Sequence, residues 1–224
     1  MIRRYDSGAA FLAENQAFLD TKPQISAFMA LDAPLLEKTD KINYAARCEK
    51  DGKTLLAMKV EPYHLQLFGD ADCAGELLDF LVRGGYEIQN YLSEKTLGDA
   101  AAREMEARFG IRYEEALAMA FMEARTLTEP SSPEVEAANE DDLDEIYACM
   151  ERFLVECNLQ DQPNREAMRR NIGGFRVIRA DGKIVSVGKA VRDIGESMRI
   201  TNVYTREAYR GKGYARKVVN TIKN

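Results

Sequence analysis

The stretch from Arg199 to Ala215 constrains this chain more than any other, because it joins a strand pattern to a helix pattern through a short glycine-containing run. Residues 200–205 are dense in β-branched and aromatic side chains, which is typical of a strand. After the glycines, apolar residues recur at i, i+3, i+4 and i+7, the spacing of one helix face. These residues are Ala215, Val218, Val219 and Ile222. The sequence therefore predicts a strand, a turn and the start of a helix.

The turn has the character of an anion site. Gly211 and Gly213 let the backbone come close to a ligand, and the unpaired N–H groups of the first helical turn carry the positive end of the helix dipole. Arg210 and Lys212 add cationic side chains to the same turn. We therefore expect a phosphate or pyrophosphate here, the alternative being a basic turn that binds nothing. The run lacks the Gly-Lys-Ser/Thr ending of a P-loop and the three-glycine spacing of a dinucleotide fold.

Length and charge limit the classes of function. A chain of 224 residues has room for one large or two small domains. Its net charge of −6 argues against binding to nucleic acid or to anionic membranes, which both call for a large basic face, and is compatible with a cationic amine substrate. No apolar run reaches the length of about 18 residues that crosses a bilayer, and residues 1–6 lead into no signal-peptide core. We expect a cytoplasmic protein.

The cysteines and the single histidine argue against metal chemistry. Cys48, Cys73, Cys149 and Cys157 are widely spread and form no C-x-x-C pair, which favours reduced, buried thiols over disulfides or a zinc site. Cys149 and Cys157 lie in a helical pattern, which indicates core packing. Because His64 is the only histidine, a histidine-rich metal centre is excluded, and we interpret His64 as a packed or surface residue.

The N-terminal part alternates between helix and strand patterns. Helices are expected over residues 6–19, 24–36 with a break at Pro34, 71–82 and 97–109. The first helix should turn Ala10, Phe11, Ala17 and Phe18 inward. A hairpin is expected over 42–48 and 54–60, turned by Asp51-Gly52, with a further strand over 64–69. Residues 116–127 have helical propensity but also alternate weakly.

Residues 128–133 are predicted to form a linker, because this run of six residues contains two prolines and two serines. We expect one domain over 1–130 and a second over 134–224. In the second, a short strand over 135–138 precedes helices over 139–156 and 163–172. Three strands follow over 175–179, 184–192 and 197–205, turned by Asp181-Gly182 and by residues 193–196. The two Asp-Gly turns indicate either an internal duplication or a coincidence of common turns.

The motif Arg210-x-x-Gly213-x-Ala215, following a strand that ends Val203-Tyr204-Thr205, resembles the acyl-CoA pyrophosphate loop of the GNAT superfamily of N-acyltransferases. The longer string around it is similar to a bacterial branch with two GNAT-like halves. The resemblance implies an α/β fold with a mixed α+β sheet, an N-terminal GNAT-like half and an incomplete C-terminal GNAT domain. It also favours a strand over a helix at 116–127.

The same resemblance implies acetyl-CoA as co-substrate, with no metal, and an unidentified primary amine as acceptor. If the binding positions of the family are carried over residue by residue, Val203 and Thr205 would pair with the pantetheine arm, and Arg210 would be the first residue of the motif. The pyrophosphate would meet the backbone amides of Gly211, Lys212, Gly213, Tyr214 and Ala215.

The reaction would be direct attack of the amine on the thioester, with backbone N–H of Val203 stabilising the oxyanion. Arg199 stands where some relatives have a glutamate base, and it cannot accept a proton at neutral pH. Glu196 is the candidate for a water-mediated base, the alternative being a solvated hairpin charge, and Asn202 is the candidate for orienting that water.

GNAT domains continue past this helix with a strand and a helix that carries a tyrosine acid, whereas this sequence stops at Asn224. From this we expect a shortened GNAT domain with weak or no turnover, or a non-catalytic module that binds CoA or associates with proteins. The exposed edge of the motif strand favours a homodimer.

Overall fold

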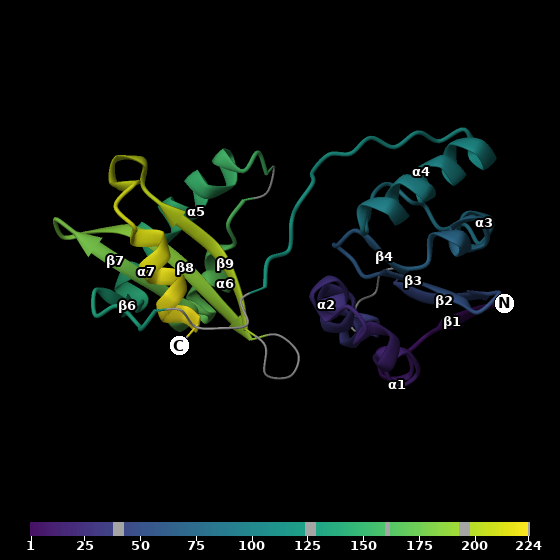
Figure 1. Ribbon diagram of the computed structural model, residues 1–224, viewed down its shortest axis with the longest axis horizontal. Coiled ribbons are helices and arrows are strands. Elements are labelled where there is room, and N and C mark those ends of the chain that lie inside the picture. The colour runs from purple at the N-terminus through teal and green to yellow at the C-terminus, as the bar shows by residue number, and fades with distance from the viewer. Residues whose placement is uncertain (38–42, 124–128, 160–161, 193–197, 224) are drawn as a thin grey trace. The chain divides into compact units, whose positions relative to one another are not determined.

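A computed structural model describes residues 1–37, 43–123, 129–159, 162–192 and 198–223. The chain divides into two compact units, Met1–Met122 and Glu123–Asn224, which we call unit 1 and unit 2. Each unit contains a sheet of its own with helices on both faces (Figure 1). The predicted fold class, α/β with a mixed sheet, is confirmed.

Unit 1 is built on a five-stranded sheet in the order β1-β2-β3-β4-β5. Its elements are β1 (Ile2–Tyr5), α1 (Gly8–Leu19), α2 (Pro23–Asp32), β2 (Tyr44–Lys50), β3 (Lys53–Lys59), β4 (Leu65–Gly69), α3 (Ala74–Arg83), β5 (Tyr91–Leu92) and α4 (Lys95–Phe109), with short 3-10 turns η1 (Ala33–Leu35) and η2 (Ala71–Cys73). Neighbouring strands are antiparallel except β4 and β5, which are parallel. Helices α1 and α2 pack on one face and α3 and α4 on the other.

The predicted helix over 6–19 is confirmed as α1, and its start follows from Ser7, whose hydroxyl accepts from Ala10 N–H. The expected inward positions Ala10 and Ala17 are wrong, because both are exposed. Asn15 is buried instead. Its amide is hydrogen-bonded there, donating to the Phe11 carbonyl at 2.8 Å and accepting from Arg47 at 2.9 Å.

Two short strands of unit 1 were missed, β1 and β5, because neither shows the alternation or the β-branched content of a strand. The strand expected over 116–127 is wrong over residues 116–123, which form neither strand nor helix, and residues 124–127 lie outside the described part. Leu117, Met119 and Met122 are exposed, so the weak alternation there corresponds to no buried face in this structure.

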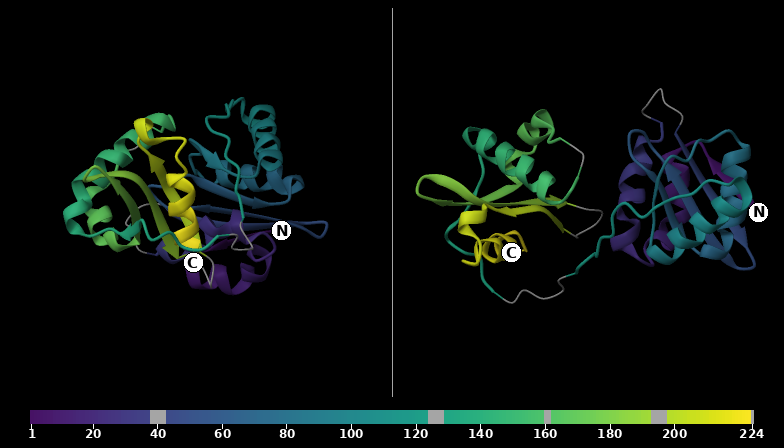
Figure 2. Two further views of the ribbon diagram at one scale, coloured as in Figure 1. Left: turned by 60° about the vertical axis from the view of Figure 1, so that its left-hand side comes forward. Right: turned by 90° about the horizontal axis from the view of Figure 1, so that it is seen from above.

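Unit 2 is built on an antiparallel four-stranded sheet in the order β6-β7-β8-β9. Its elements are β6 (Val135–Ala137), α5 (Leu143–Glu156), α6 (Arg165–Arg170), β7 (Phe175–Ala180), β8 (Lys183–Arg192), β9 (Met198–Thr205) and α7 (Tyr214–Lys223), with 3-10 turns η3 (Glu140–Asp142), η4 (Ile172–Gly174) and η5 (Glu207–Tyr209). Helices α5 and α6 cover one face and α7 covers the other, as Figure 2 shows from above. Strand β9 is therefore the last strand of this sheet in the described structure.

The start of α5 is fixed by a capping box. The Asn139 side chain accepts from the backbone of the first turn, and the Asp142 carboxylate accepts from Asn139 N–H at 3.0 Å. Asp142 is almost fully buried and also pairs with Arg179 of β7 at 2.6 Å. These contacts join the helix to the sheet.

The predicted linker contributes contacts to unit 2. Glu129 pairs with Arg216, and Glu134 accepts from Lys217 at 2.6 Å, both on α7. Ser132 N–H donates to the Thr221 hydroxyl at 3.0 Å. Residues 129–134 thus lie along the exposed side of α7.

The two units repeat one order of elements. Strand, two helices, three antiparallel strands and a helix occur as β1-α1-α2-β2-β3-β4-α3 and as β6-α5-α6-β7-β8-β9-α7. Asp51 and Asp181 have φ values of 50° and 53° and open equivalent turns. Because the match covers whole units, it favours an internal duplication over a coincidence of two turns.

Candidate acyl-CoA site

The end of β9 is held firmly against β8. Arg206 N–H donates to the Val185 carbonyl at 2.9 Å, and its guanidinium donates to the Ile184 carbonyl at 2.6 Å. The hydroxyls of Ser186 and Thr205 lie 2.8 Å apart. The start of the following loop is therefore fixed relative to β8.

A β-bulge lies in the middle of β9. Val187 pairs with Tyr204 and Lys189 with Thr201, so Asn202 and Val203 together oppose the single residue Gly188. Asn202 has a φ of 56°, in the left-handed region that asparagine tolerates better than most residues. A bulge interrupts the ladder of hydrogen bonds and bends the strand. Backbone groups around Val203 are thereby available to another molecule at the sheet edge.

The loop after β9 presents free backbone amides. Gly211 and Gly213 have φ values of 76° and 79°, which only glycine adopts at little cost. Within the described chain, the N–H groups of Gly211, Lys212 and Gly213 find no acceptor. A Cβ on either glycine would meet nothing within 4 Å, so the space before the loop is open. The loop leads directly into the N-terminus of α7, where an anion is stabilised by the helix dipole.

The two cations of the loop differ in their surroundings. Arg210 donates to the Thr205 carbonyl at 2.9 Å and to Glu156 Oε2 at 2.5 Å, and its guanidinium lies 5.7 Å from the centroid of the Tyr204 ring. Its guanidinium therefore fastens the loop to β9 and to α5. Lys212 is different: its ammonium lies over the Tyr209 ring at 5.1 Å and, among the described residues, faces no carboxylate partner.

A cavity of about 530 Å³ lies between the end of α5, β9 and the loop. It is lined by Phe153, Glu156, Cys157, Val203, Tyr204, Thr205, Tyr209, Arg210, Gly211, Gly213, Tyr214 and Ala215. The lining combines an apolar floor, the strand edge and the amide-bearing loop. Such a cavity suits a long ligand with an anionic end.

Helix α7 packs closely against the sheet. Gly188 of β8 makes this possible, because a Cβ there would lie 2.7 Å from Val218 Cγ1. Val218 is fully buried and Ile222 nearly so, which agrees with the apolar face predicted from the sequence. The N-terminus of the helix is thus fixed relative to β9.

The structure brings most of the predicted binding residues together. Val203, Thr205 and all of the residues from Arg210 to Ala215 except Lys212 line the cavity. Asn202 points elsewhere: its amide donates to Met150 Sδ on α5 at 3.2 Å and accepts from the Thr201 hydroxyl at 2.9 Å. Glu196 lies outside the described residues, as does the turn at 193–196.

Five lining residues were not predicted to bind the ligand: Phe153, Tyr204, Tyr209, Glu156 and Cys157. Two of them, Glu156 and Cys157, lie at the C-terminal end of α5. Both follow the last apolar position of the α5 pattern, and only the fold places them beside a loop more than 50 residues later. The expectation that all four cysteines are buried is wrong for Cys157, which is exposed, whereas Cys48, Cys73 and Cys149 are buried as predicted. Burial raises the pKa of the Cys149 thiol.

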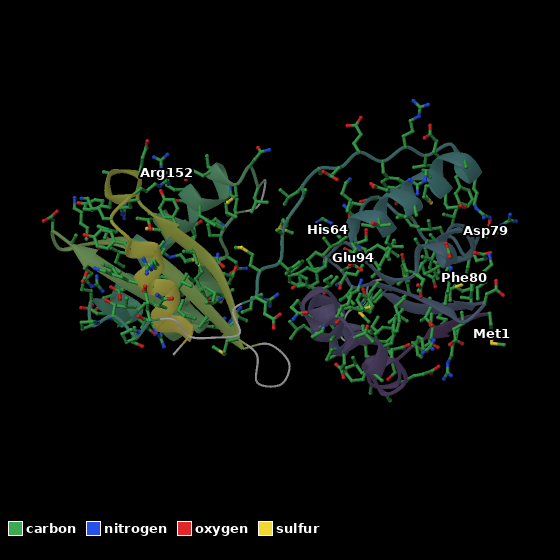
Figure 3. All side chains as sticks on the ribbon, viewed as in Figure 1. Met1, His64, Asp79, Phe80, Glu94 and Arg152 are labelled. Carbon is green, nitrogen blue, oxygen red and sulfur yellow. The ribbon has the colours of Figure 1, made fainter. Side chains whose placement is uncertain are left out.

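Among the described residues of unit 1, no glycine loop corresponds to residues 210–213 of unit 2. The chain passes from β4 through Asp70 into η2 without a glycine loop, and Asp70 Oδ2 accepts from Thr54 N–H at 2.9 Å. Asp72 and Glu76 place negative charge in the following turn, which repels an anion. His64, the only histidine, is exposed on unit 1 and lies 2.7 Å from Asn90 Oδ1 (Figure 3). Among the described residues, no cluster of His, Cys, Asp and Glu has the arrangement of a metal site.

Comparison with protein-family models identifies a family for most of unit 2. Residues 136–224 match the model of the acetyltransferase (GNAT) family. This part of the chain is a GNAT acetyltransferase domain. The match covers β6 to α7, and it includes the bulged strand, the glycine loop and most of the cavity lining. No curated protein sequence matches the chain significantly.

Three solved structures are similar to this chain at low identity. Rv2747 from Mycobacterium tuberculosis, solved in complex with CoA and NLQ, is 19% identical over 41% of this chain and 55% of its own, with a TM-score of 0.37. N-acetylglutamate synthase from Neisseria gonorrhoeae, complexed with CoA and N-acetyl-glutamate, is 19% identical over 40% of this chain and 21% of its own, with a TM-score of 0.36. A GNAT-family acetyltransferase from Colwellia psychrerythraea is 11% identical over 99% of this chain and 84% of its own, with a TM-score of 0.46.

The chain thus spans about half the length of the first of these proteins and about a fifth of the second. In the described part of the chain, no helix combines the length and the apolar character that a membrane span requires.

Proposed function

We propose that this protein binds acetyl-CoA in the cavity of unit 2 and transfers the acetyl group to a primary amine. The observation that carries the proposal is the open cavity joining the edge of β9 to the free amides of Gly211, Lys212 and Gly213. A pyrophosphate needs such amides at a helix N-terminus. The GNAT family match over residues 136–224 supports acetyl-CoA over a generic phosphate.

The geometry suggests how the donor would lie. The pantetheine arm carries amide groups that can pair with the backbone of Val203 and Thr205 along the open edge of β9. The Thr205 carbonyl already accepts from Arg210, and a carbonyl oxygen has a second lone pair for a ligand N–H. The thioester would then reach the bulge, where N–H of Val203 is the proposed oxyanion donor.

In the proposed reaction a neutral amine nitrogen attacks the thioester carbon, and a tetrahedral oxyanion forms. The C–S bond then breaks, CoA leaves as a thiolate that takes up a proton, and the amide remains. The amine must lose a proton to a base. Glu196 stays a prediction for this base, and a Glu196→Gln variant whose pH–rate profile matches that of the wild type would exclude it.

Two measurements test the proposed function. Titration calorimetry should show one acetyl-CoA per chain, since unit 1 lacks the glycine loop and has Asp70 and Asp72 in its place. Inorganic phosphate should compete far less well than CoA. A thiol-release assay with a panel of primary amines should then show acetyl-CoA consumption that depends on the amine. Binding without amine-dependent release would indicate a CoA-binding module, and no binding would reject the proposal.

A further inference from the structure

Lys189 lies beside the part of β9 where the reaction is proposed. On β8 it pairs with Phe175 of β7 on one side and with Thr201 of β9 on the other. Residues paired across neighbouring strands share one face of the sheet. Phe175 belongs to the core cluster under α5, so Lys189 and Thr201 both face the α5 side.

This is also the face on which the bulge opens. Thr201 precedes the bulge directly, and the Asn202 side chain reaches Met150 of α5. If the thioester lies along the β9 edge at Val203, an acceptor that approaches from the α5 side passes Lys189. The location therefore fits a residue that binds the acceptor and not the cofactor.

The ammonium of Lys189 is a partly buried charge. Its Nζ lies 5.3 Å from the centroid of the buried Phe175 ring, and its methylene stem runs along Gly174. Burial lowers the pKa of Lys189, because desolvation disfavours the charged form. An anion beside the ammonium would compensate for this loss of hydration.

Several other cations of unit 2 are already paired with carboxylates. Arg179 pairs with Asp142, Arg206 with Glu145, and Arg210 with Glu156. For Lys189, by contrast, no carboxylate of the described chain lies within ion-pairing distance. In a chain with a net charge of −6, such an ammonium at a partly buried position is available for the anion of a ligand.

We propose that Lys189 binds the carboxylate of the acceptor, so that the substrates are amino acids and not simple amines. The inference rests on the proposed acetyl transfer and adds the class of acceptor to it. A charge-assisted hydrogen bond between ammonium and carboxylate would orient the amine toward the thioester.

The test compares matched acceptors that differ only in the carboxylate: L-phenylalanine with phenethylamine, L-leucine with isopentylamine and L-lysine with cadaverine. Lys189→Met keeps the length of the side chain and removes its charge, and Lys189→Arg restores a charge. The control is Lys183→Met, an exposed lysine at the start of the same strand.

The wild type should acetylate at least one amino acid with a higher kcat/KM than its matched amine. In Lys189→Met this kcat/KM should fall by about tenfold to a hundredfold, mainly through KM, whereas the rate with the matched amine stays unchanged. Lys189→Arg should recover part of the loss, and Lys183→Met should behave as the wild type. A merely structural role of Lys189 would lower the rates for both members of a pair equally.

Failure of this inference is distinguishable from failure of the proposed function. Acetylation of amines without a preference for the carboxylate overturns the role of Lys189 and leaves acetyl transfer intact. If no acceptor in the panel is acetylated, ligand-observed NMR with CoA-saturated protein still tests the site. Amino-acid binding that is lost in Lys189→Met supports the inference, and the absence of such binding overturns it.

Discussion

Arg210 Nη2 lies 2.5 Å from Glu156 Oε2, while Nε of the same guanidinium donates to the Thr205 carbonyl at 2.9 Å. The first cation of the loop is therefore paired with a carboxylate. Glu156 and Arg210 both line the cavity, and the Tyr204 hydroxyl lies 3.5 Å from the second oxygen of Glu156. The carboxylate thus occupies a position where an anionic ligand would benefit from the charge of Arg210.

We predict that Glu156→Gln tightens acetyl-CoA binding. The substitution keeps the shape of the side chain and removes a negative charge that competes with phosphate for Arg210. Because both side chains are nearly half exposed, the pair is weak and the gain in affinity should be modest, about twofold to fivefold. Glu166→Gln is the control, since Glu166 forms an exposed ion pair with Arg170 on α6 and its loss changes the net charge equally. Weaker binding in Glu156→Gln would mean that the carboxylate supports the loop instead of competing with the ligand.

A second prediction concerns Gly213. Gly213→Glu places a negative side chain at the amides proposed to hold the pyrophosphate, and acetyl-CoA affinity should fall by at least about tenfold, measured by calorimetry. The left-handed φ adds a backbone cost of about 1–2 kcal/mol for any other residue. Gly52→Glu is the matched control, because Gly52 has a φ of 75° and equally open surroundings in the β2–β3 turn. Equal acetyl-CoA affinity of the wild type and Gly213→Glu would contradict the location of the site.

The sequence predicted the strand, loop and helix of this site because their signals are local. Glycine spacing marks the loop, and the positions of Val218 and Ile222 mark the buried face of α7. Glu156 could not be found in this way, because it meets Arg210 only after α5 packs on the sheet. The bulge at Asn202 was also missed, because an extra residue in one strand is visible only against its partner strand.

Similar limits apply to the fold of unit 1. Asn15 was not predicted to be buried, because the donor to its amide oxygen, Arg47, lies on β2 and reaches it only in the folded unit. Strand β1 has two arginines in four residues and takes its conformation from pairing with β2. In unit 2, the surroundings of Lys189 likewise arise only from the folded sheet, where Phe175 and Thr201 flank it on the two neighbouring strands.

Cys157 provides a reporter of the cavity. It is exposed and lines the cavity, whereas the other three cysteines are buried. Burial raises the pKa of Cys73 to about 11, so at about pH 8 only about one in a thousand Cys73 thiols is ionised and reactive. Burial also raises the pKa of the Cys48 and Cys149 thiols. N-ethylmaleimide should therefore modify one thiol per native chain, and acetyl-CoA should slow that reaction. Cys157→Ser should remove the fast modification, as mass spectrometry would show. A modification rate that acetyl-CoA does not change would contradict occupancy of this cavity.

The contact between Asp142 and Arg179 predicts how the stability of unit 2 depends on pH. Burial alone would raise the pKa of Asp142, but the hydrogen bonds from Arg179 and from Asn139 N–H, with the charge of Arg179, lower it below its usual value. A carboxyl whose pKa is lowered by folding contributes stability above its unfolded pKa of about 3.9, and this contribution is lost as the pH falls through the folded pKa.

Asp142→Asn should therefore destabilise the protein by about 1–2 kcal/mol at about pH 7, because the cap and the ion pair are both weakened. The difference from the wild type should shrink at about pH 3, where the wild-type carboxylate is itself becoming protonated. Urea unfolding followed by circular dichroism measures the free energy of unfolding at both pH values. The neighbouring Asp141→Asn is the control, because Asp141 is exposed in the same turn. A difference between Asp142→Asn and the wild type that is independent of pH would show that Asp142 acts through its shape and hydrogen bonds and not through its charge.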